Sequence, residues 1–180
     1  MLKIEIPESE DYDPIHNLFV YHKKQTLVME HSLVSLSKWE SEFKKPYLSD
    51  DQKTIEETLA YIRYMTITPN VNEEVYSRLP YDAYNKIKKY IEDPMTATTF
   101  NNKEEKKTKK EVITSELIYY WMIALGIPFE CQKWHLNRLL TLIRVCGIKN
   151  APQKKMSRRE LLAQNRALNA ARRKSLGTKG

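Results

Sequence analysis

The chain is 180 residues long with 41% hydrophobic residues and a mean hydropathy of −0.62, so it can fold around one core. It has no apolar run of the ~20 residues that a membrane-spanning helix needs, and its N-terminal residues lack the basic and apolar regions of a signal peptide. The net charge is +7, but nine of the 30 Lys and Arg and only one of the 23 acidic residues lie after residue 150. Residues 1–150 therefore hold 21 basic and 22 acidic side chains, and the basicity belongs to the C-terminal segment. Because two cysteines do not make a disulfide framework, we expect a cytoplasmic protein with no membrane partner.

The first part of the chain, about residues 1–30, predicts a short antiparallel β-ribbon. Leu2, Ile4 and Ile6 alternate with charged residues, as in a strand with one buried face. A second apolar run, QTLVME, occupies residues 25–30, and the FVYHKKQ segment before it fits either a strand or a turn.

The next segment changes to helical spacing and predicts two amphipathic helices. The first is capped by Ser32 and ends before Pro46, and its apolar stripe consists of Leu33, Leu36, Trp39 and Phe43. The second opens with Ser49 and Gln52 at capping-box spacing, and its stripe consists of Ile55, Leu59, Ile62 and Met65.

A short helix capped by Asn72 and a longer helix that stops at Asp93–Pro94 are predicted next. The apolar side of the longer helix consists of Tyr84, Ile87 and Ile91. The PMTATTFNN segment predicts irregular structure, and the charged NKEEKKTKKE segment at residues 102–111 predicts a solvated loop.

Two apolar segments predict an antiparallel helical hairpin at the centre of the fold. The first, ITSELIYYWMIALGIPF, enters at Thr114 or Ser115, closes at Gly126 and is apolar nearly all round, so we expect it to be buried on several sides. The second, ECQKWHLNRLLTLIRVCGI, predicts one helix that stops at Gly147, with its inward positions at Leu136, Leu139 or Leu140, Ile143 and Cys146. The predicted fold class is therefore mainly α, with residues 31–150 as a helical core.

Residues 151–180 predict a protruding basic helical arm. Ser157 and Glu160 have capping-box spacing, and Met156 and Leu161 occupy the two positions of a hydrophobic staple. With Gly177 as its end, the helix would have about 18 residues and a length of ~27 Å. Such a helix is only marginally stable alone in water, because packing supplies most helical stability.

Catalytic and metal-binding patterns are weak. Cys131 and His135 share a helix face, with Cys146 later on the same helix, but a zinc site needs four ligands, and the other histidines are isolated in the N-terminal region, at His16, His22 and His31. A nucleophilic Cys–His pair would lack an orienting acid and an oxyanion hole, and the carboxylates fall in helix first turns, where they complement the helix dipole. We therefore expect no enzyme, no metal and no cofactor.

The arm is the main candidate for binding a partner. Its positions Leu161, Leu168 and Ala171 make a thin apolar seam flanked by arginines, which suits a helix laid against another protein. Phosphate-backbone binding fits the arginines nearly as well, although the arm has no aromatic residue for base stacking. The predicted partner-binding residues are Arg158, Arg159, Leu161, Arg166, Leu168, Arg172, Arg173 and Lys174.

Four stretches together resemble a group of small proteins of long-tailed bacteriophages and prophages, the tail assembly chaperones: MEHSLVSLSKWE, PMTATTF, ITSELIYYWMIALGIPFECQKWHLNRLLTLIRVCGIKNAP and LNAARRKSLGTKG. The resemblance covers most of the chain. It implies a mainly helical, non-enzymatic protein of the host cytoplasm that binds the tape-measure protein, keeps it soluble and is absent from the finished particle. The arm would then grip this partner or a neighbouring copy. Two alternatives stay open: a structural virion component, such as a tail-completion or connector subunit, and a nucleic-acid-binding protein that uses the arm.

Overall fold

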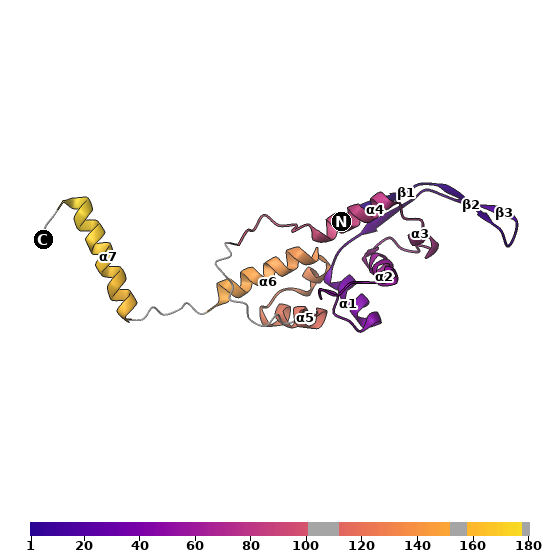
Figure 1. Ribbon diagram of the computed structural model, residues 1–180. Coiled ribbons are helices and arrows are strands. Elements are labelled where there is room, and N and C mark those ends of the chain that lie inside the picture. Colours follow the sequence, from indigo (N-terminus) through magenta and orange to yellow (C-terminus); the bar gives the residue numbers. More distant parts are fainter. Residues whose placement is uncertain (101–111, 152–157, 178–180) are drawn as a thin grey trace. The chain divides into compact units, whose positions relative to one another are not determined.

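The computed structural model describes residues 1–100, 112–151 and 158–177, and the fold is mainly α, as predicted (Figure 1). The chain divides into two compact units, Met1–Gly147 and Ile148–Gly180, where the sequence analysis placed the division after residue 150. The elements in chain order are β1 (Leu2–Ile6), β2 (Ser9–Asp13), β3 (Leu18–His22), β4 (Gln25–Met29), α1 (Leu33–Phe43), α2 (Ile55–Met65), α3 (Glu74–Ser77), α4 (Tyr81–Glu92), α5 (Ser115–Ala124), the short 3₁₀ helix η1 (Phe129–Lys133), α6 (Leu136–Asn150) and α7 (Arg158–Leu176).

The predicted N-terminal ribbon is confirmed and is longer than the two apolar runs suggested. Strands β1 and β4 pair antiparallel, and β2 and β3 pair antiparallel farther out along the same hairpin. The inner pair buries the alternating residues Ile4, Ile6, Leu27 and Met29 against the helices. The outer β2–β3 hairpin extends away from the helices of this unit (Figure 1).

The core of the first unit has two parts that share α1. One part consists of buried residues of β1, β4, α2, α3 and α4 together with Trp39 of α1. In the other, Leu33 and Leu36 of α1 pack against apolar residues of α5, η1 and α6. The carboxylate of Glu40 adds a polar link between them, because its two oxygens accept backbone hydrogen bonds from Tyr47 at 2.9 Å and from Ser115 at 2.7 Å. The shared helix α1 therefore lies at the centre of the unit.

The start of α1 is confirmed, whereas the predicted start of α2 is wrong. Ser32 caps α1 as expected, and α1 ends at Phe43, where the left-handed conformation of Lys44 breaks it before Pro46. The capping box of α2 is formed by Thr54 and Glu57, not by Ser49 and Gln52. The Thr54 hydroxyl accepts from the Glu57 N–H at 3.2 Å, and the Glu57 carboxylate accepts from the Thr54 N–H at 2.8 Å; such a cap contributes about 1 kcal/mol.

The buried face of α2 is rotated from the predicted stripe. Ile55 is 81% exposed and Leu59 is only half-buried, whereas Ile62 and Met65 are buried together with Glu57, Ala60 and Tyr61. Short helix α3 begins after Glu73, and the predicted cap Asn72 instead accepts from the Glu74 N–H at 3.2 Å. Helix α4 ends before Asp93–Pro94, as predicted.

Two features of the predicted helical hairpin need correction. The first helix is entered through Thr114, and Gly126 follows it with φ of 64°, as predicted. The expectation that this helix is buried on several sides is wrong, because Tyr120 and Ile123 on α5 are exposed. The second segment is not one helix: η1 comes first, the chain then runs through Trp134 and His135, and α6 follows. At this break the Trp134 N–H donates to the Cys131 carbonyl at 3.0 Å, and the Leu136 N–H donates to the carbonyl of His31, just before α1, at 2.7 Å.

Helix α6 also continues past its predicted end. It runs to Asn150 through Gly147, whose φ is not positive. A Cβ atom added at Gly147 would meet no other atom within 4 Å. A glycine in a helix lowers its stability without ending it. The predicted solvated loop at 102–111, and the predicted roles of Met156 and Ser157 at the start of the arm, lie outside the described residues.

Candidate protein-binding surfaces

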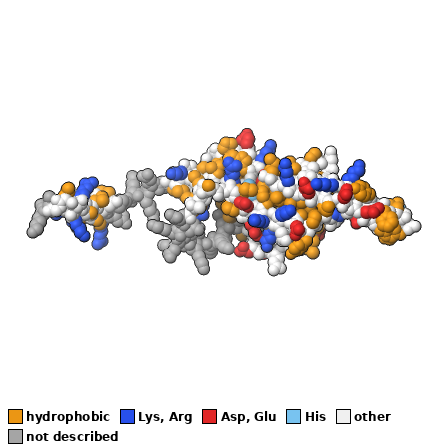
Figure 2. Space-filling view, turned by 90° about the horizontal axis from the view of Figure 1, so that it is seen from above, with side chains coloured by type: hydrophobic (Ala, Val, Ile, Leu, Met, Phe, Trp, Pro, Cys, Tyr) orange, Lys and Arg blue, Asp and Glu red, His pale blue; other side chains and the backbone are white. Residues whose placement is uncertain are grey.

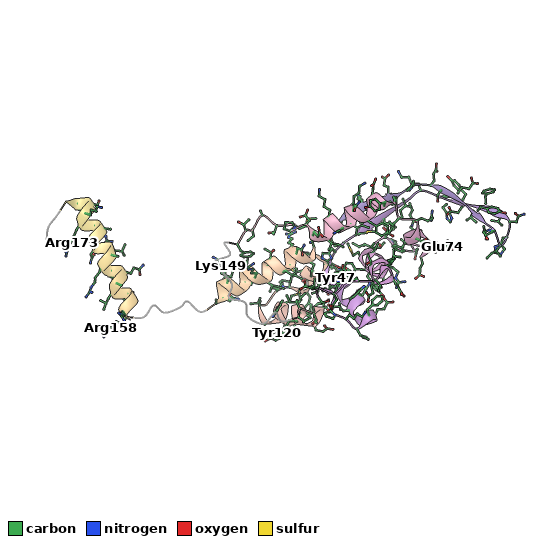
Figure 3. The ribbon with its side chains drawn as sticks, viewed as in Figure 1. Tyr47, Glu74, Tyr120, Lys149, Arg158 and Arg173 are labelled. Carbon is green, nitrogen blue, oxygen red and sulfur yellow. The ribbon has the colours of Figure 1, made fainter. Side chains whose placement is uncertain are left out.

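Helix α7 contains all eight predicted partner-binding residues, and every one of them is exposed. The helix has 19 residues, and Gly177 follows it with φ of 63°, the left-handed conformation that commonly ends helices. Figure 3 shows the α7 side chains, with Arg158 and Arg173 labelled, pointing outward around the helix axis. The helix therefore presents its apolar and its basic side chains to solvent alike.

The helical repeat separates these side chains into two faces. At about 100° per residue, Leu161, Leu168 and Ala171 fall within one arc of about 80°, which we call the seam. Nearly opposite, Arg159, Arg166 and Arg173 recur every seven residues and form a row along the helix, which we call the arginine ridge. The arginines were predicted to flank the seam, whereas three of them are aligned on the side of α7 nearly opposite to it.

A second exposed surface, not among the predicted binding residues, lies on the β2–β3 hairpin. The register pairs Tyr12 with Phe19 and Glu10 with Tyr21, so these four side chains share one face of the hairpin. The rings of Tyr12, Phe19 and Tyr21 are 52%, 68% and 59% exposed. Figure 2 shows hydrophobic and acidic side chains gathered at the right-hand end, where this hairpin lies. We call this surface the aromatic finger.

The finger is also acidic. Residues 8–22 contain Glu8, Glu10, Asp11 and Asp13 and no Lys or Arg. The Tyr21 hydroxyl donates to the Glu8 carboxylate at 2.6 Å, which raises the pKa of Tyr21. At the tip, hydrogen bonds from the His16 ring and from backbone N–H groups lower the pKa of Asp13. Glu8 and Glu10 therefore lie beside the aromatic rings, whereas Asp11 and Asp13 lie on the opposite face and pair with His22 and His16.

The sequence contained a usable signal for the finger. In SEDYD and LFVYH, aromatic residues alternate with acidic or aliphatic ones, the period of a strand with two unlike faces. Strands were predicted from alternating apolar residues. Strand β2 was not predicted because it has only one aromatic residue and no aliphatic one. The strand forms because its partner β3 supplies the aromatic and aliphatic half of each cross-strand pair.

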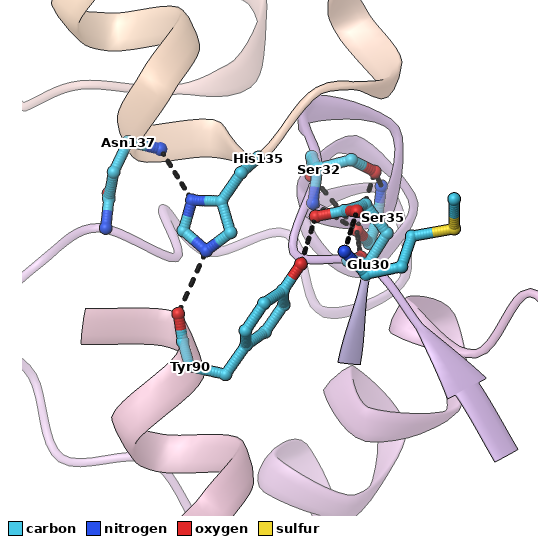
Figure 4. Close-up of polar contacts among 7 residues, drawn as sticks. Glu30, Ser32, Ser35, Tyr90, His135 and Asn137 are labelled. Atoms are coloured by element: carbon cyan, nitrogen blue, oxygen red, sulfur yellow. Dashed lines mark hydrogen bonds and ion pairs between the residues drawn. The ribbon is translucent and has the colours of Figure 1, made fainter. Parts of the chain in front are cut away.

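The rejected metal and nucleophile candidates occupy structural positions. Cys131 is buried in η1, Cys146 is half-buried on α6, and both thiols are free. The His135 ring is bonded on both nitrogens: Nε2–H donates to the Tyr90 carbonyl at 2.9 Å, and Nδ1 accepts from the Asn137 N–H at 3.3 Å (Figure 4). Among the described residues, no group of three or more His, Cys, Asp or Glu is placed to hold a metal ion.

One histidine was wrongly taken as isolated. The His31 ring lies 5.1 Å from the His135 ring, in the buried region where α1, α4 and α6 meet. Burial, with a smaller contribution from His135, lowers the pKa of His31 to about 3, so the ring is neutral at physiological pH. Burial raises the pKa of Tyr61, so its hydroxyl keeps its proton and donates to the Nδ1 of His31 at 2.5 Å.

A hydrogen bond between Tyr90 and Glu30, near this histidine pair, connects α4 with the end of the ribbon. The Tyr90 hydroxyl donates to the Glu30 carboxylate at 2.6 Å, and the Met1 ammonium lies 3.2 Å from the same carboxylate (Figure 4). These groups come from three distant parts of the sequence and hold them together. Their arrangement stabilises the fold, and α7 and the finger each present exposed apolar groups beside charged ones.

None of the helices in the described ranges combines the length and hydropathy of a membrane span. Comparison with protein families, with curated proteins and with solved structures finds no match for this chain.

Proposed function

We propose that this chain is a tail assembly factor of long-tailed bacteriophages that binds the tape-measure protein in the host cytoplasm, through α7, and catalyses no reaction. The observation that carries the proposal is the uncovered seam of α7: Leu161 and Leu168 are each 48% exposed, on a helix whose described side chains are all exposed. Since an isolated helix of this length is marginal in water, a protein partner that covers the seam would stabilise both the helix and the complex.

The seam has the spacing of a helix–helix contact. Leu161 and Leu168 are one heptad apart, and Ala171 takes the next inward position, where a small side chain lets two helices approach closely. Arg172 and Lys174 border the seam on its two sides, so the expected partner is an apolar helical stripe flanked by acidic residues. A long coiled-coil protein such as a tape-measure protein offers stripes of this kind.

Placing charge on the seam is expected to abolish this contact. In the double variant Leu161→Asp with Leu168→Asp, two leucines that would each contribute about 1.5–3 kcal/mol when buried are replaced by carboxylates. Tagged full-length chain recovered from infected cells should therefore bring down the tape-measure protein, as read by mass spectrometry, and the variant should recover at least ~10-fold less.

A matched control adds the same two charges off the seam. The double variant Ala163→Asp with Ala170→Asp, on the side of α7 away from the seam, should recover the tape-measure protein as the native chain does. Equal recovery by native and seam-variant chains would contradict the proposal. Recovery of nucleic acid in place of protein would also contradict it and would assign α7 to phosphate binding. The presence of the chain in purified particles would identify a virion subunit instead.

A further inference from the structure

The aromatic finger has a chemistry that selects its ligand. Three aromatic rings lie uncovered on one face, which also carries Glu10, opposite Tyr21, and Glu8, whose carboxylate accepts from the Tyr21 hydroxyl. Exposed aromatic clusters of this kind mark binding surfaces. A guanidinium satisfies both components at once, because it stacks on an aromatic ring and donates a forked pair of hydrogen bonds to a carboxylate. The finger therefore fits a row of arginines better than an apolar or acidic partner.

This chain itself carries such a row, the arginine ridge of α7. Arg159, Arg166 and Arg173 are all exposed, and successive members are ~10 Å apart along the helix. On the finger, the Tyr12–Phe19 pair and the Glu10–Tyr21 pair are successive rows of one face, ~7 Å apart. The flexible arginine side chains can bridge the remaining ~3 Å, so two ridge arginines can each reach one row.

We propose that the arginine ridge of one copy of this chain docks on the aromatic finger of a second copy. The inference goes beyond the tail assembly role, because it uses the side of α7 nearly opposite the seam and leaves Leu161 and Leu168 free for the tape-measure protein. The two interacting surfaces are unlike, so the contact is heterologous: each copy offers one finger and one ridge, and association continues head to tail.

Sedimentation velocity of the full-length chain tests this proposal. At about 50 mM salt the mean mass should rise with protein concentration, and at about 500 mM it should return to that of the monomer, since the charges are exposed and screened by salt. Two variants should each stay monomeric at low salt: a finger variant, Phe19→Ser with Tyr21→Ser, and a ridge variant, Arg166→Glu with Arg173→Glu. The variant Tyr120→Ser removes an equally exposed aromatic ring elsewhere and should associate normally.

Mixing the two defective variants gives the most specific result. The ridge variant keeps an intact finger and the finger variant keeps an intact ridge, so an equimolar mixture should form dimers and nothing larger. A native chain that stays monomeric at low salt, or a mixture that stays monomeric, would overturn the proposal. The seam variant Leu161→Asp with Leu168→Asp should still associate, so failure of tape-measure binding and failure of self-association are separate outcomes.

Discussion

Replacing Trp39 with alanine is expected to lower the free energy of unfolding by about 3–5 kcal/mol, the cost of emptying a large buried aromatic site. The Trp39 side chain is buried among α1, α2 and the ribbon, and its ring centroid lies 5.0 Å from those of Phe43 and Tyr47. The indole N–H also donates to the Glu57 carbonyl at 2.8 Å, and the variant leaves this buried acceptor without its partner. Urea unfolding followed by circular dichroism measures the change.

The matched control is Tyr120→Ala on α5. Tyr120 is 63% exposed, so its removal should change the free energy of unfolding by no more than about 0.5 kcal/mol. A loss of less than about 1 kcal/mol for Trp39→Ala would contradict the assignment of α1 to the centre of the core.

Acidification is expected to destabilise the protein through His31. The pKa of this buried ring is about 3 in the folded chain and about 6.5 in the unfolded chain. Below pH 6.5 the unfolded chain therefore binds a proton that the folded chain does not, and stability falls as the pH falls, by up to about 1.4 kcal/mol per pH unit, until about pH 3. Between pH 6.5 and pH 4 the His31 contribution is a loss of about 3 kcal/mol.

The variant His31→Gln isolates this contribution, because its amide oxygen can accept the Tyr61 hydrogen bond and does not titrate. Its free energy of unfolding should depend less steeply on pH between 6.5 and 4 than that of the native chain. The control is Tyr120→Ala, which changes an exposed residue on α5 and should keep the native slope. If nuclear magnetic resonance shows the His31 ring protonating near pH 6 in the folded native chain, the assignment is wrong.

Much of the fold could be predicted from local patterns. Helix α1 was found with its cap because Ser32 and the stripe from Leu33 to Phe43 act within one segment, and Gly126 and Gly177 gave the ends of α5 and α7 by their backbone freedom. The wrong predictions arose where two local signals were equally acceptable. Ser49 and Thr54 are both acceptable caps, and in the folded chain the carboxylate of Glu57, the partner of Thr54, also lies 2.6 Å from the ammonium of Lys45.

Of the two candidate surfaces, the sequence predicted the arm and not the finger. The arm stood out because its charge and its alanine-rich composition differ from those of the body. The finger did not, because its aromatic face exists only once β2 and β3 are paired, in a register that brings Tyr12 beside Phe19. The pairing of His31 with His135 was likewise invisible, since 103 intervening residues separate the two rings in the sequence.

The central claim is that α7 gains its stability from another molecule, and amide hydrogen exchange tests it most directly. In the dilute full-length chain at high salt, the amides of residues 158–176 should exchange far faster than those of α2, whose inner face is buried. Adding the tape-measure protein should protect α7 and leave α2 unchanged. Protection of α7 equal to that of α2 in the isolated chain would contradict the claim.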